Sequence, residues 1–310
     1  MVPVAEWRMS GQVRIATRRS RLALWQAEHV AARLAACHPG LVVSLVPIVT
    51  EGDRIQDRSL AAAGGKGLFI KELENALQDG RADIAVHSMK DMPAALPDGF
   101  AIAAALERGD PRDCLVSLQY GSLVALPRGA RIGTSSLRRQ CQLRHRRPDL
   151  ETVVLRGNVD TRLAKLDAGA CDATVLAAAG LERLGLESRI RARLEPAEML
   201  PAVAQGIIGI ECVQGREDIA ALVHPLEHGP TRSMLDAERA FAARIGASCH
   251  SPIAGHATLD GGTLRLDGLA GSPDGRSILV DAVTGAVRDA AALGAELAGR
   301  LLAAGAGKLL

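Results

Sequence analysis

Short apolar runs alternate with amphipathic, helix-like stretches along the first two thirds of the chain. The apolar runs predict strands, which we expect at residues 13–17, 41–49, 83–87, 131–134, 152–155 and 173–177. The amphipathic stretches predict helices, which we expect at residues 20–37, 68–78, 137–146, 159–167 and 180–184. Short buried strands that alternate with helices are typical of parallel sheets covered on both faces. Because this alternation of strands and helices occurs twice, the pattern predicts two α/β lobes.

The last third of the chain has a different pattern. A helix is expected at residues 231–245, and three short alternating strands follow at residues 253–259, 263–269 and 277–283. Turns at Asp260-Gly261-Gly262 and Asp274-Gly275 separate these strands, and an Ala/Leu-rich helix is expected at residues 290–303. A run of strands followed by a helix indicates a small α+β domain.

The composition of the chain favours arginine over lysine as the basic residue. The chain has 310 residues and a formal charge of +2, yet only five of its 37 basic residues are lysines. Arginine offers a planar fork of donors that fits carboxylate or phosphate groups. The amino terminus has no apolar core of signal-peptide length, and no stretch resembles a membrane span, so we expect a cytoplasmic protein. The six cysteines have no C-x-x-C spacing, which argues against a disulfide framework and against a metal site.

Arginines cluster between Arg131 and Arg162, where eight of them stand against three acids. A solvated basic face is one interpretation of such a cluster. The other is an anion site, because Thr134, Ser135 and Ser136 lie where a strand ends and a helix begins, and helix amino termini attract anions. Arginines in the first helical turn oppose the helix dipole unless an anion binds there, so residues 133–139 (GTSSLRR) predict a carboxylate or phosphate cradle.

Polar residues also follow the other predicted strands. His87-Ser88-Met89-Lys90-Asp91 comes directly after one strand, Thr17-Arg18-Arg19-Ser20 after another, and Arg156-Gly157-Asn158 after a third. Ligands of open α/β sheets bind beyond the carboxyl ends of the strands. Taken alone, each of these segments could consist either of ordinary surface residues or of residues that bind a ligand.

Two further segments carry candidate chemistry. Gly64-Gly65-Lys66-Gly67 lacks the Ser or Thr of a phosphate-binding loop and fits a glycine-hinged lid that would carry Phe69. Cys249 lies in a loop of small residues near Arg244 and His250, which would favour its thiolate form, although an inert thiol is the alternative.

Taken together, the motifs resemble the porphobilinogen deaminase (hydroxymethylbilane synthase) family, in order along the chain from about Arg14. They are RIATRRS (14–20), LALWQ (22–26), GGKGLF (64–69), ADIAVHSMKDMP (82–93), GTSSLRRQ (133–140), LRGNVDTR (155–162), PAVAQG (201–206) and the loop around Cys249. The resemblance implies two α/β lobes like those of type 2 periplasmic binding proteins plus a small C-terminal α+β domain. It places the first lobe at residues 1–106 and 207–224, the second at 107–206 and the C-terminal domain at 229–310.

The resemblance also implies an activity in tetrapyrrole and haem biosynthesis. Members join four porphobilinogen molecules head to tail, with loss of ammonia, on a dipyrromethane cofactor that a thioether attaches to a cysteine. Each unit brings two carboxylates, which suits a site rich in arginine. Each addition also passes through a cation, which suits a carboxylate that accepts pyrrole N–H bonds and moves a proton.

Residue by residue, the resemblance assigns Cys249 as the attachment site and Asp91 as the catalytic group. The implied cofactor-binding residues are Arg18, Ser20, Ser88, Lys90, Thr134, Ser136, Arg138, Arg139, Arg156 and Gln205. The implied substrate-binding residues are Arg18, Arg156, Arg162, Arg183, Lys66 and Phe69. The chain departs from the common pattern at Ala62, Asp160 and Ala204, where many members carry a lysine and two glycines.

Porphobilinogen is therefore the expected small-molecule partner, with no nucleic acid, no membrane and no metal, and a monomer is expected. Two rival functions remain open. A binding module could clamp an anion without catalysis, and a nucleic-acid protein could use the Arg131–Arg162 cluster, although the chain lacks the lysines and stacking aromatics of such a face.

Overall fold

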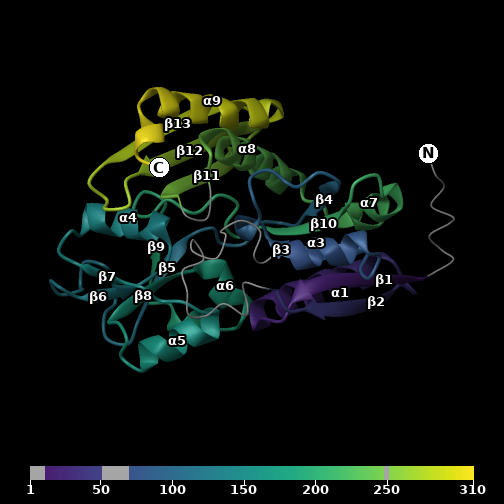
Figure 1. The fold of residues 1–310 in the computed structure, drawn as a ribbon, viewed down its shortest axis with the longest axis horizontal. Helices are drawn as coiled ribbons and strands as arrows, with labels where there is room; N and C mark the ends of the chain where they lie inside the picture. Colours follow the sequence, from purple (N-terminus) through teal and green to yellow (C-terminus); the bar gives the residue numbers. More distant parts are fainter. Residues whose placement is uncertain (1–10, 51–69, 248–250) are drawn as a thin grey trace. The chain divides into compact units, whose positions relative to one another are not determined.

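The computed structural model describes residues 11–50, 70–247 and 251–310 (Figure 1). The chain forms two compact units. The first combines the residues up to Arg108 with Ile207–Arg232, and the second combines Gly109–Gly206 with Ser233–Leu310. Ala62, Lys66, Phe69 and Cys249 lie outside the described residues. The domain boundaries expected from the sequence stay a prediction.

The first unit contains a five-stranded sheet with the order β2-β1-β3-β10-β4. Its strands are β1 (Gln12–Arg18), β2 (Val42–Ile48), β3 (Ile84–Ser88), β4 (Phe100–Ala105) and β10 (Ile208–Val213). β1 runs parallel to β2 and β3, whereas β10 is antiparallel to both of its neighbours.

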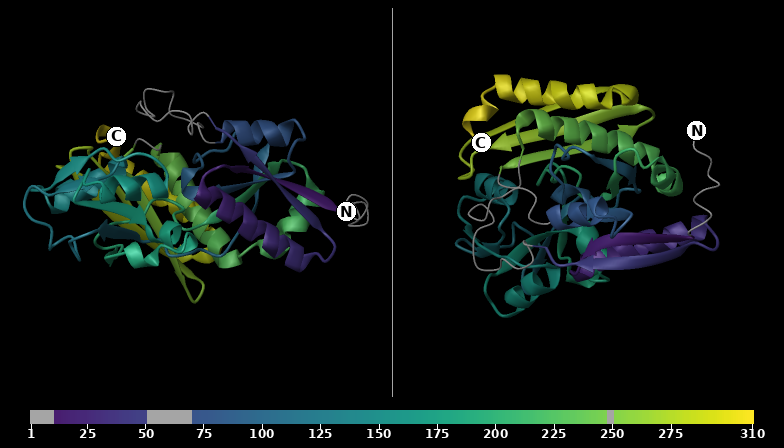
Figure 2. Two further views of the ribbon diagram at one scale, coloured as in Figure 1. Left: turned by 90° about the horizontal axis from the view of Figure 1, so that it is seen from below. Right: turned by 45° about the vertical axis from the view of Figure 1, so that its right-hand side comes forward.

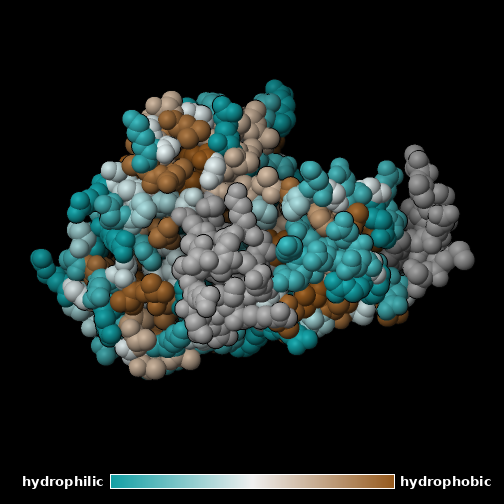
Figure 3. Space-filling view, viewed as in Figure 1, coloured by the Kyte–Doolittle hydropathy of each residue, from teal (hydrophilic) through white to brown (hydrophobic). Residues whose placement is uncertain are grey.

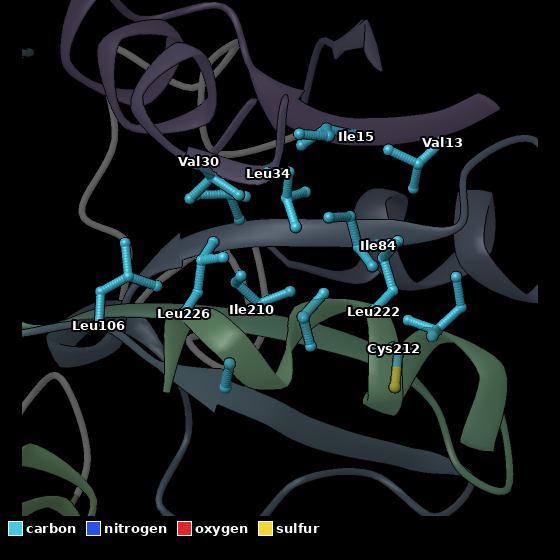
Figure 4. Packing of buried hydrophobic residues seen from close by; sticks show 14 of the residues in the cluster. Val13, Ile15, Val30, Leu34, Ile84, Leu106, Ile210, Cys212, Leu222 and Leu226 are labelled. Atoms are coloured by element: carbon cyan, nitrogen blue, oxygen red, sulfur yellow. The ribbon is translucent and has the colours of Figure 1, made fainter. Parts of the chain in front are cut away.

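Helices cover both faces of this sheet. On one face α1 (Arg21–Cys37) and α7 (Glu217–Val223) pack on the main core, which includes Ile15, Ile84 and Ile210 and is shown in Figure 4. On the other face α3 (Lys71–Gln78) buries Leu73, Ala76 and Leu77 against Ala16 and Ala85. The sheet is therefore an interior layer, which leaves its strand ends as the accessible polar sites.

The second unit contains another five-stranded sheet, with the order β7-β6-β8-β5-β9. Its strands are β5 (Asp113–Ser117), β6 (Arg131–Gly133), β7 (Glu151–Val153), β8 (Ala173–Ala177) and β9 (Ala192–Leu194). The helix α4 (Leu137–Arg146) contributes Leu143 to the core on one face. The helices α5 (Val159–Asp167) and α6 (Ala178–Arg183) contribute to the core on the other.

The two sheets share an arrangement of strands and a short sequence signature, neither of which was predicted from the sequence. The sequence Arg-Ile-x-Thr occurs in both, from Arg14 within β1 and from Arg131 at the start of β6. Nη2 of Arg14 lies 2.9 Å from Oδ1 of Asp83, just before β3, and Nη2 of Arg131 lies 3.4 Å from Oδ1 of Asp172, just before β8. In each case the same aspartate also accepts the backbone N–H of its arginine. The pair ties the starts of two parallel strands together in both sheets.

The C-terminal part of the second unit is an antiparallel meander of β11 (Ile253–Asp260), β12 (Thr263–Gly271) and β13 (Ile278–Ala286). Two helices, α8 (Gly229–Ile245) and α9 (Ala290–Ala303), share its apolar core, and Figure 2 shows α9 running along the sheet. The turn between β12 and β13 contacts α4, where Nη1 of Arg144 donates to the carbonyl of Pro273 over 2.7 Å. This contact fastens the meander to the sheet of the same unit.

The α/β class, the two lobes and the C-terminal α+β domain are confirmed. The expectation of parallel sheets is confirmed for β1, β2 and β3 and for β6, β7 and β8. It is wrong for the rest of each sheet, because β10 and β5 run antiparallel to β3 and β8. Four strands, β4, β5, β9 and β10, were not predicted from the sequence, and each is only three to six residues long. Short 3-10 turns complete the described elements, at Met89–Asp91, Glu187–Arg189, His224–Leu226, Val287–Asp289 and Ala306–Lys308.

In the described part of the chain, no helix is both long enough and apolar enough to cross a bilayer. On the face shown in Figure 3, apolar residues form separate patches among hydrophilic ones.

Ala204 has the one positive φ angle, 59°, among the described residues other than glycine. Its N–H donates to Oε2 of the fully buried Glu238, whose Oε1 accepts the N–H of Ala257 over 2.7 Å. This left-handed conformation gives a physical reason for the glycine that the family resemblance places at this position.

We expect Ala204→Gly to raise the free energy of unfolding by up to about 1 kcal/mol, since relief of the left-handed strain outweighs the added entropy of the unfolded chain. Denaturant unfolding would measure it. Ala32→Gly on the exposed side of α1 is the matched control and should cost about 1 kcal/mol. A loss of stability in Ala204→Gly would contradict the expectation.

Candidate functional site

A pocket of about 60 Å³ lies at the carboxyl ends of β1 and β3 in the first unit. Its polar lining residues are Arg18, Ser20, Gln26, His87, Ser88 and Asp91. The adjacent parallel strands bring Arg18 and Ser20, which follow β1, next to Ser88 and Asp91, which follow β3. The structure therefore gathers four of the residues singled out from the sequence at one edge of one sheet.

Hydroxyl groups in this pocket are oriented by their own hydrogen bonds. Ser20 is the N-cap of α1, and its side chain accepts the N–H of Ala23 over 3.3 Å. The Ser88 hydroxyl accepts from Nε2 of the buried Gln26 over 2.7 Å. Both hydroxyl protons are then available for an acceptor in the pocket. The first turn of α1 contains no acidic residue, so the positive end of its dipole also favours an anion here.

Asp91 ends a single 3-10 turn, Met89–Asp91, that follows β3 directly. The Asp91 side chain is exposed, Lys90 is half-buried, and Met89 is only 1% exposed. An exposed carboxylate on a turn whose first residue is buried is suited to accept hydrogen bonds from a ligand and to exchange a proton with it.

Behind the pocket, three titratable side chains are buried together. Nε2 of His87 lies 2.9 Å from Oε2 of Glu211 on β10, and both side chains are almost inaccessible. Glu74 on α3 is the third, and burial together with the charge of Glu211 raises the pKa of its carboxyl group. A buried carboxylate requires a partner, and His87 provides one for Glu211.

The second unit contains a different charged cluster, centred on the fully buried Asp113 at the start of β5. Its Oδ2 accepts from Nη1 of Arg138 over 2.7 Å, and its Oδ1 accepts from Nη2 of Arg139 over 2.7 Å. Nε2 of Gln205 also donates to Oδ1, over 3.0 Å. Two guanidinium groups and an amide thus converge on one carboxylate at the amino-terminal end of α4.

Pairing overrides the cost of burial in this cluster. Burial by itself would raise the pKa of Asp113, but the charges and hydrogen bonds of Arg138 and Arg139 hold it well below its usual range. Two cations and one anion leave a positive charge, and the hydrogen bonds of Arg138 use only its Nη1, which also donates to the carbonyl of Leu200. Nε and Nη2 of Arg138 and Nη1 of Arg139 make no hydrogen bond to the described residues. These donors suit further carboxylates.

The cap of α4 adds hydroxyl groups next to the arginines. Ser136 is the N-cap and accepts the N–H of Arg139, while Thr134 accepts the N–H of Ser136. Residues 133–139 therefore form a helix cap with two arginines, and the anion beside them in the folded chain is the Asp113 side chain. Their binding of a ligand carboxylate or phosphate stays a prediction. An acid within an apolar strand (DCLVS) was the signal that could have identified Asp113, because a buried acid needs cations.

The remaining predicted arginines of the second unit have separate environments. Arg183 at the end of α6 donates from Nη2 to the carbonyl of Gly206 over 2.6 Å, and burial lowers its pKa to about 10. Arg156 precedes Gly157 at the turn into α5, and Arg162 is half-buried on that helix, two residues after Asp160. Arg147, just after the end of α4, pairs with Asp149 at 2.7 Å.

Sequence models of families match nearly the whole chain. Residues 13–221 match "Porphobilinogen deaminase, dipyromethane cofactor binding domain", and residues 234–303 match "Porphobilinogen deaminase, C-terminal domain". The chain belongs to the porphobilinogen deaminase family. A porphobilinogen deaminase of Stenotrophomonas maltophilia is 58% identical over 96% of this chain and 98% of its own length. That of Chromobacterium violaceum is 55% identical over 96% of both chains.

Solved structures of binding proteins are also similar to this chain. The periplasmic VFT2 domain of Bordetella pertussis BvgS has 16% identity and a TM-score of 0.43, covering 71% of this chain and 88% of that one. The methionine binding protein MetQ has 15% identity and a TM-score of 0.44, covering 69% and 89%.

The residues present fit the cofactor named for this family. A dipyrromethane with acidic arms needs hydrogen-bond donors for its carboxylates, and the Asp113 cluster offers three guanidinium nitrogens that make no hydrogen bond to the described residues, beside the Thr134 and Ser136 hydroxyls. Cys249 lies outside the described residues. The described cysteines carry free thiols, with Cys37 exposed and Cys114, Cys141, Cys171 and Cys212 buried.

We expect Asp113→Asn to lower the free energy of unfolding at neutral pH by about 3–5 kcal/mol, because two buried guanidinium groups lose their counter-charge. The pKa of Asp113 is depressed in the folded protein, so its stabilising effect is present above the unfolded pKa of about 4 and is lost as the pH falls below that value. Denaturant unfolding of parent and variant between pH 3 and 8 should show a constant difference above about pH 5 that narrows as the pH falls below about 4.

Asp267→Asn is the matched control for this experiment. Asp267 pairs with the exposed Arg265 at 2.6 Å on the surface of the meander, so its removal should cost less than about 1 kcal/mol. Equal losses in the two variants at neutral pH would show that Asp113 is not a buried counter-ion.

Proposed function

We propose that the protein joins four porphobilinogen molecules head to tail into hydroxymethylbilane, releasing ammonia, on a dipyrromethane primer held by Cys249 through a thioether. It is thus a transferase of tetrapyrrole biosynthesis. Family membership across nearly the whole chain supports the activity. The observation that carries it is the placement of Asp91 in the same pocket as Arg18 and Ser20.

That pocket matches a substrate with both signs of charge. Porphobilinogen carries an acetate, a propionate and an aminomethyl group. Arg18, the Ser20 hydroxyl and the amino terminus of α1 favour its carboxylates, while Asp91 favours its cationic end. Arg156, Arg162 and Arg183 bind further substrate carboxylates in this proposal, together with Lys66 and Phe69 outside the described residues.

Asp91 acts in the bond-forming step. Ammonia leaves the aminomethyl group of the substrate, and a cation develops on the ring that remains. The carboxylate accepts pyrrole N–H bonds, which stabilises this charge, and it takes the proton that the attacking pyrrole carbon loses once the new C–C bond has formed. Lys90 orients a carboxylate of the bound chain beside it.

The second unit holds the primer in this proposal. When bound, the primer supplies the nucleophilic pyrrole carbon that is extended in each cycle. Arg138 and Arg139 bind its carboxylates through the donors that Asp113 does not use, and Thr134, Ser136 and Gln205 complete the cradle. Cys249 would hold the primer through its thioether, and hydrolysis would free the finished tetrapyrrole from it. A cytoplasmic monomer is part of the proposal.

The purified protein should be heavier than its sequence by two linked pyrroles, since the primer is never released. Intact-mass spectrometry measures this directly. Cys249→Ala should have the plain sequence mass, whereas Cys37→Ala, at an exposed cysteine, should keep the added mass. A parent protein at sequence mass, or added mass that persists in Cys249→Ala, would refute the tether.

Asp91→Ala should retain the primer and the stability of the parent but lose at least about 100-fold in kcat, because acid–base catalysis alone contributes roughly 10²–10⁴-fold. Consumption of porphobilinogen measures the rate. Asp98→Ala changes another exposed aspartate of the same loop region and should turn over like the parent. Near-normal turnover in Asp91→Ala would show that another group carries out the proton transfer.

A further inference from the structure

The turn that carries Asp91 has very little structure of its own. It is three residues long, its last side chain is exposed, and its internal backbone hydrogen bond runs from the Met92 N–H to the Met89 carbonyl over 3.2 Å. Nothing in so short a turn fixes where a solvated carboxylate lies. The constraint must come from what packs beneath it.

The first residues of β10 pack beneath it. The Met89 N–H donates to the carbonyl of Ile207 over 3.0 Å, which extends the ladder between β3 and β10 by one bond. The Met89 side chain lies over Gly209, where an added Cβ would be 2.0 Å from Sδ and 2.9 Å from Cγ of Met89. Gly209 has no positive φ, so its backbone does not require glycine. The missing side chain at position 209 is what admits Met89.

A second contact fixes the register of the same two strands. Glu211, two residues further along β10, is fully buried, and its hydrogen-bond partner among the described residues is Nε2 of His87 at 2.9 Å. His87 pairs with Gly209 across the ladder, and Ser88 pairs with Ile208. A slip of β10 would leave the Glu211 carboxylate buried without its partner, which is costly. The strand therefore presents Gly209 to Met89 in one register.

We propose that Met89 and Gly209 are positioning residues that set the location of the Asp91 carboxylate. Met89 is buried, so a methyl group at position 209 forces its side chain, and with it the turn, away from β10. Asp91 lies two residues further on and moves with the turn. The inference rests on the proposed function, because it concerns Asp91, the group that accepts the proton in that reaction.

The test is a double-mutant cycle on the primer-loaded protein, with kcat and KM for porphobilinogen, intact mass and melting temperature measured for each variant. Gly209→Ala should lower kcat by about 10- to 100-fold, the range expected for a displacement of about 1 Å, with little change in KM or in primer loading. Met89→Ala should lower kcat less, because it loosens the turn without displacing it. The double variant should be at least as active as Met89→Ala, because the truncated side chain leaves room for the new methyl group.

Gly285→Ala is the control for a merely structural effect. Its Cβ would lie 2.8 Å from Cδ2 of Leu293 in the C-terminal meander, so it should lose stability and keep kcat. If Gly209→Ala lost stability to the same extent and kept kcat, the proposal would be overturned. It would also be overturned if the double variant combined the two single losses in full, since independent sites add.

Two other outcomes are distinguishable: a Gly209→Ala variant that does not fold, and a parent protein that is inactive. If Gly209→Ala does not fold, the comparison of the double variant with Met89→Ala still decides, and a double variant less active than Met89→Ala contradicts the proposal. If the parent itself does not consume porphobilinogen, the proposed function fails, and this is visible before any variant is compared.

Discussion

The buried carboxylate of Asp113 holds two arginine side chains at the amino terminus of α4, and the cofactor site proposed for the second unit depends on this contact. Cations in the first turn of a helix oppose its dipole and repel each other. Asp113 removes that conflict while it uses only some of their donors. The guanidinium groups are therefore held in place before any ligand is present, and a ligand carboxylate does not have to order two long side chains on binding.

The first unit solves a different problem. In the proposed function the Asp91 carboxylate must stay solvated enough to exchange a proton, so it cannot be buried as Asp113 is. Instead the chain places Asp91 on an exposed turn and buries the residue that starts that turn, Met89. The hydroxyl groups around it are oriented by a helix cap at Ser20 and by Gln26. Rigid elements thus surround a group that itself remains accessible.

Much of this was predictable from the sequence, because it follows from local patterns. The helical repeat of apolar residues predicted the bounds of α1, α4, α5 and α9 to within one residue. Polar segments after strands correctly indicated the edge of the first sheet where Arg18, Ser20, Ser88 and Asp91 meet. The assignment of roles to those residues came from the family resemblance and not from spacing.

The features that the sequence did not reveal are non-local. β10 joins the first sheet from more than a hundred residues beyond β3, so no window along the chain could show that Glu211 faces His87 or that Gly209 lies under Met89. Asp113 is separated from Arg138 by 25 residues, and only the packing of β5 against α4 brings them together. In both cases an acid inside an apolar strand was the one local sign that a buried cationic or histidine partner existed.

A crystal structure of the purified, primer-loaded protein would test the central claim most directly. Electron density should continue from Sγ of Cys249 and end in carboxylates on Nε or Nη2 of Arg138 and on Nη1 of Arg139, while both arginines stay on Asp113. Arginines that leave Asp113 for the primer, or primer carboxylates bound away from both of them, would contradict it.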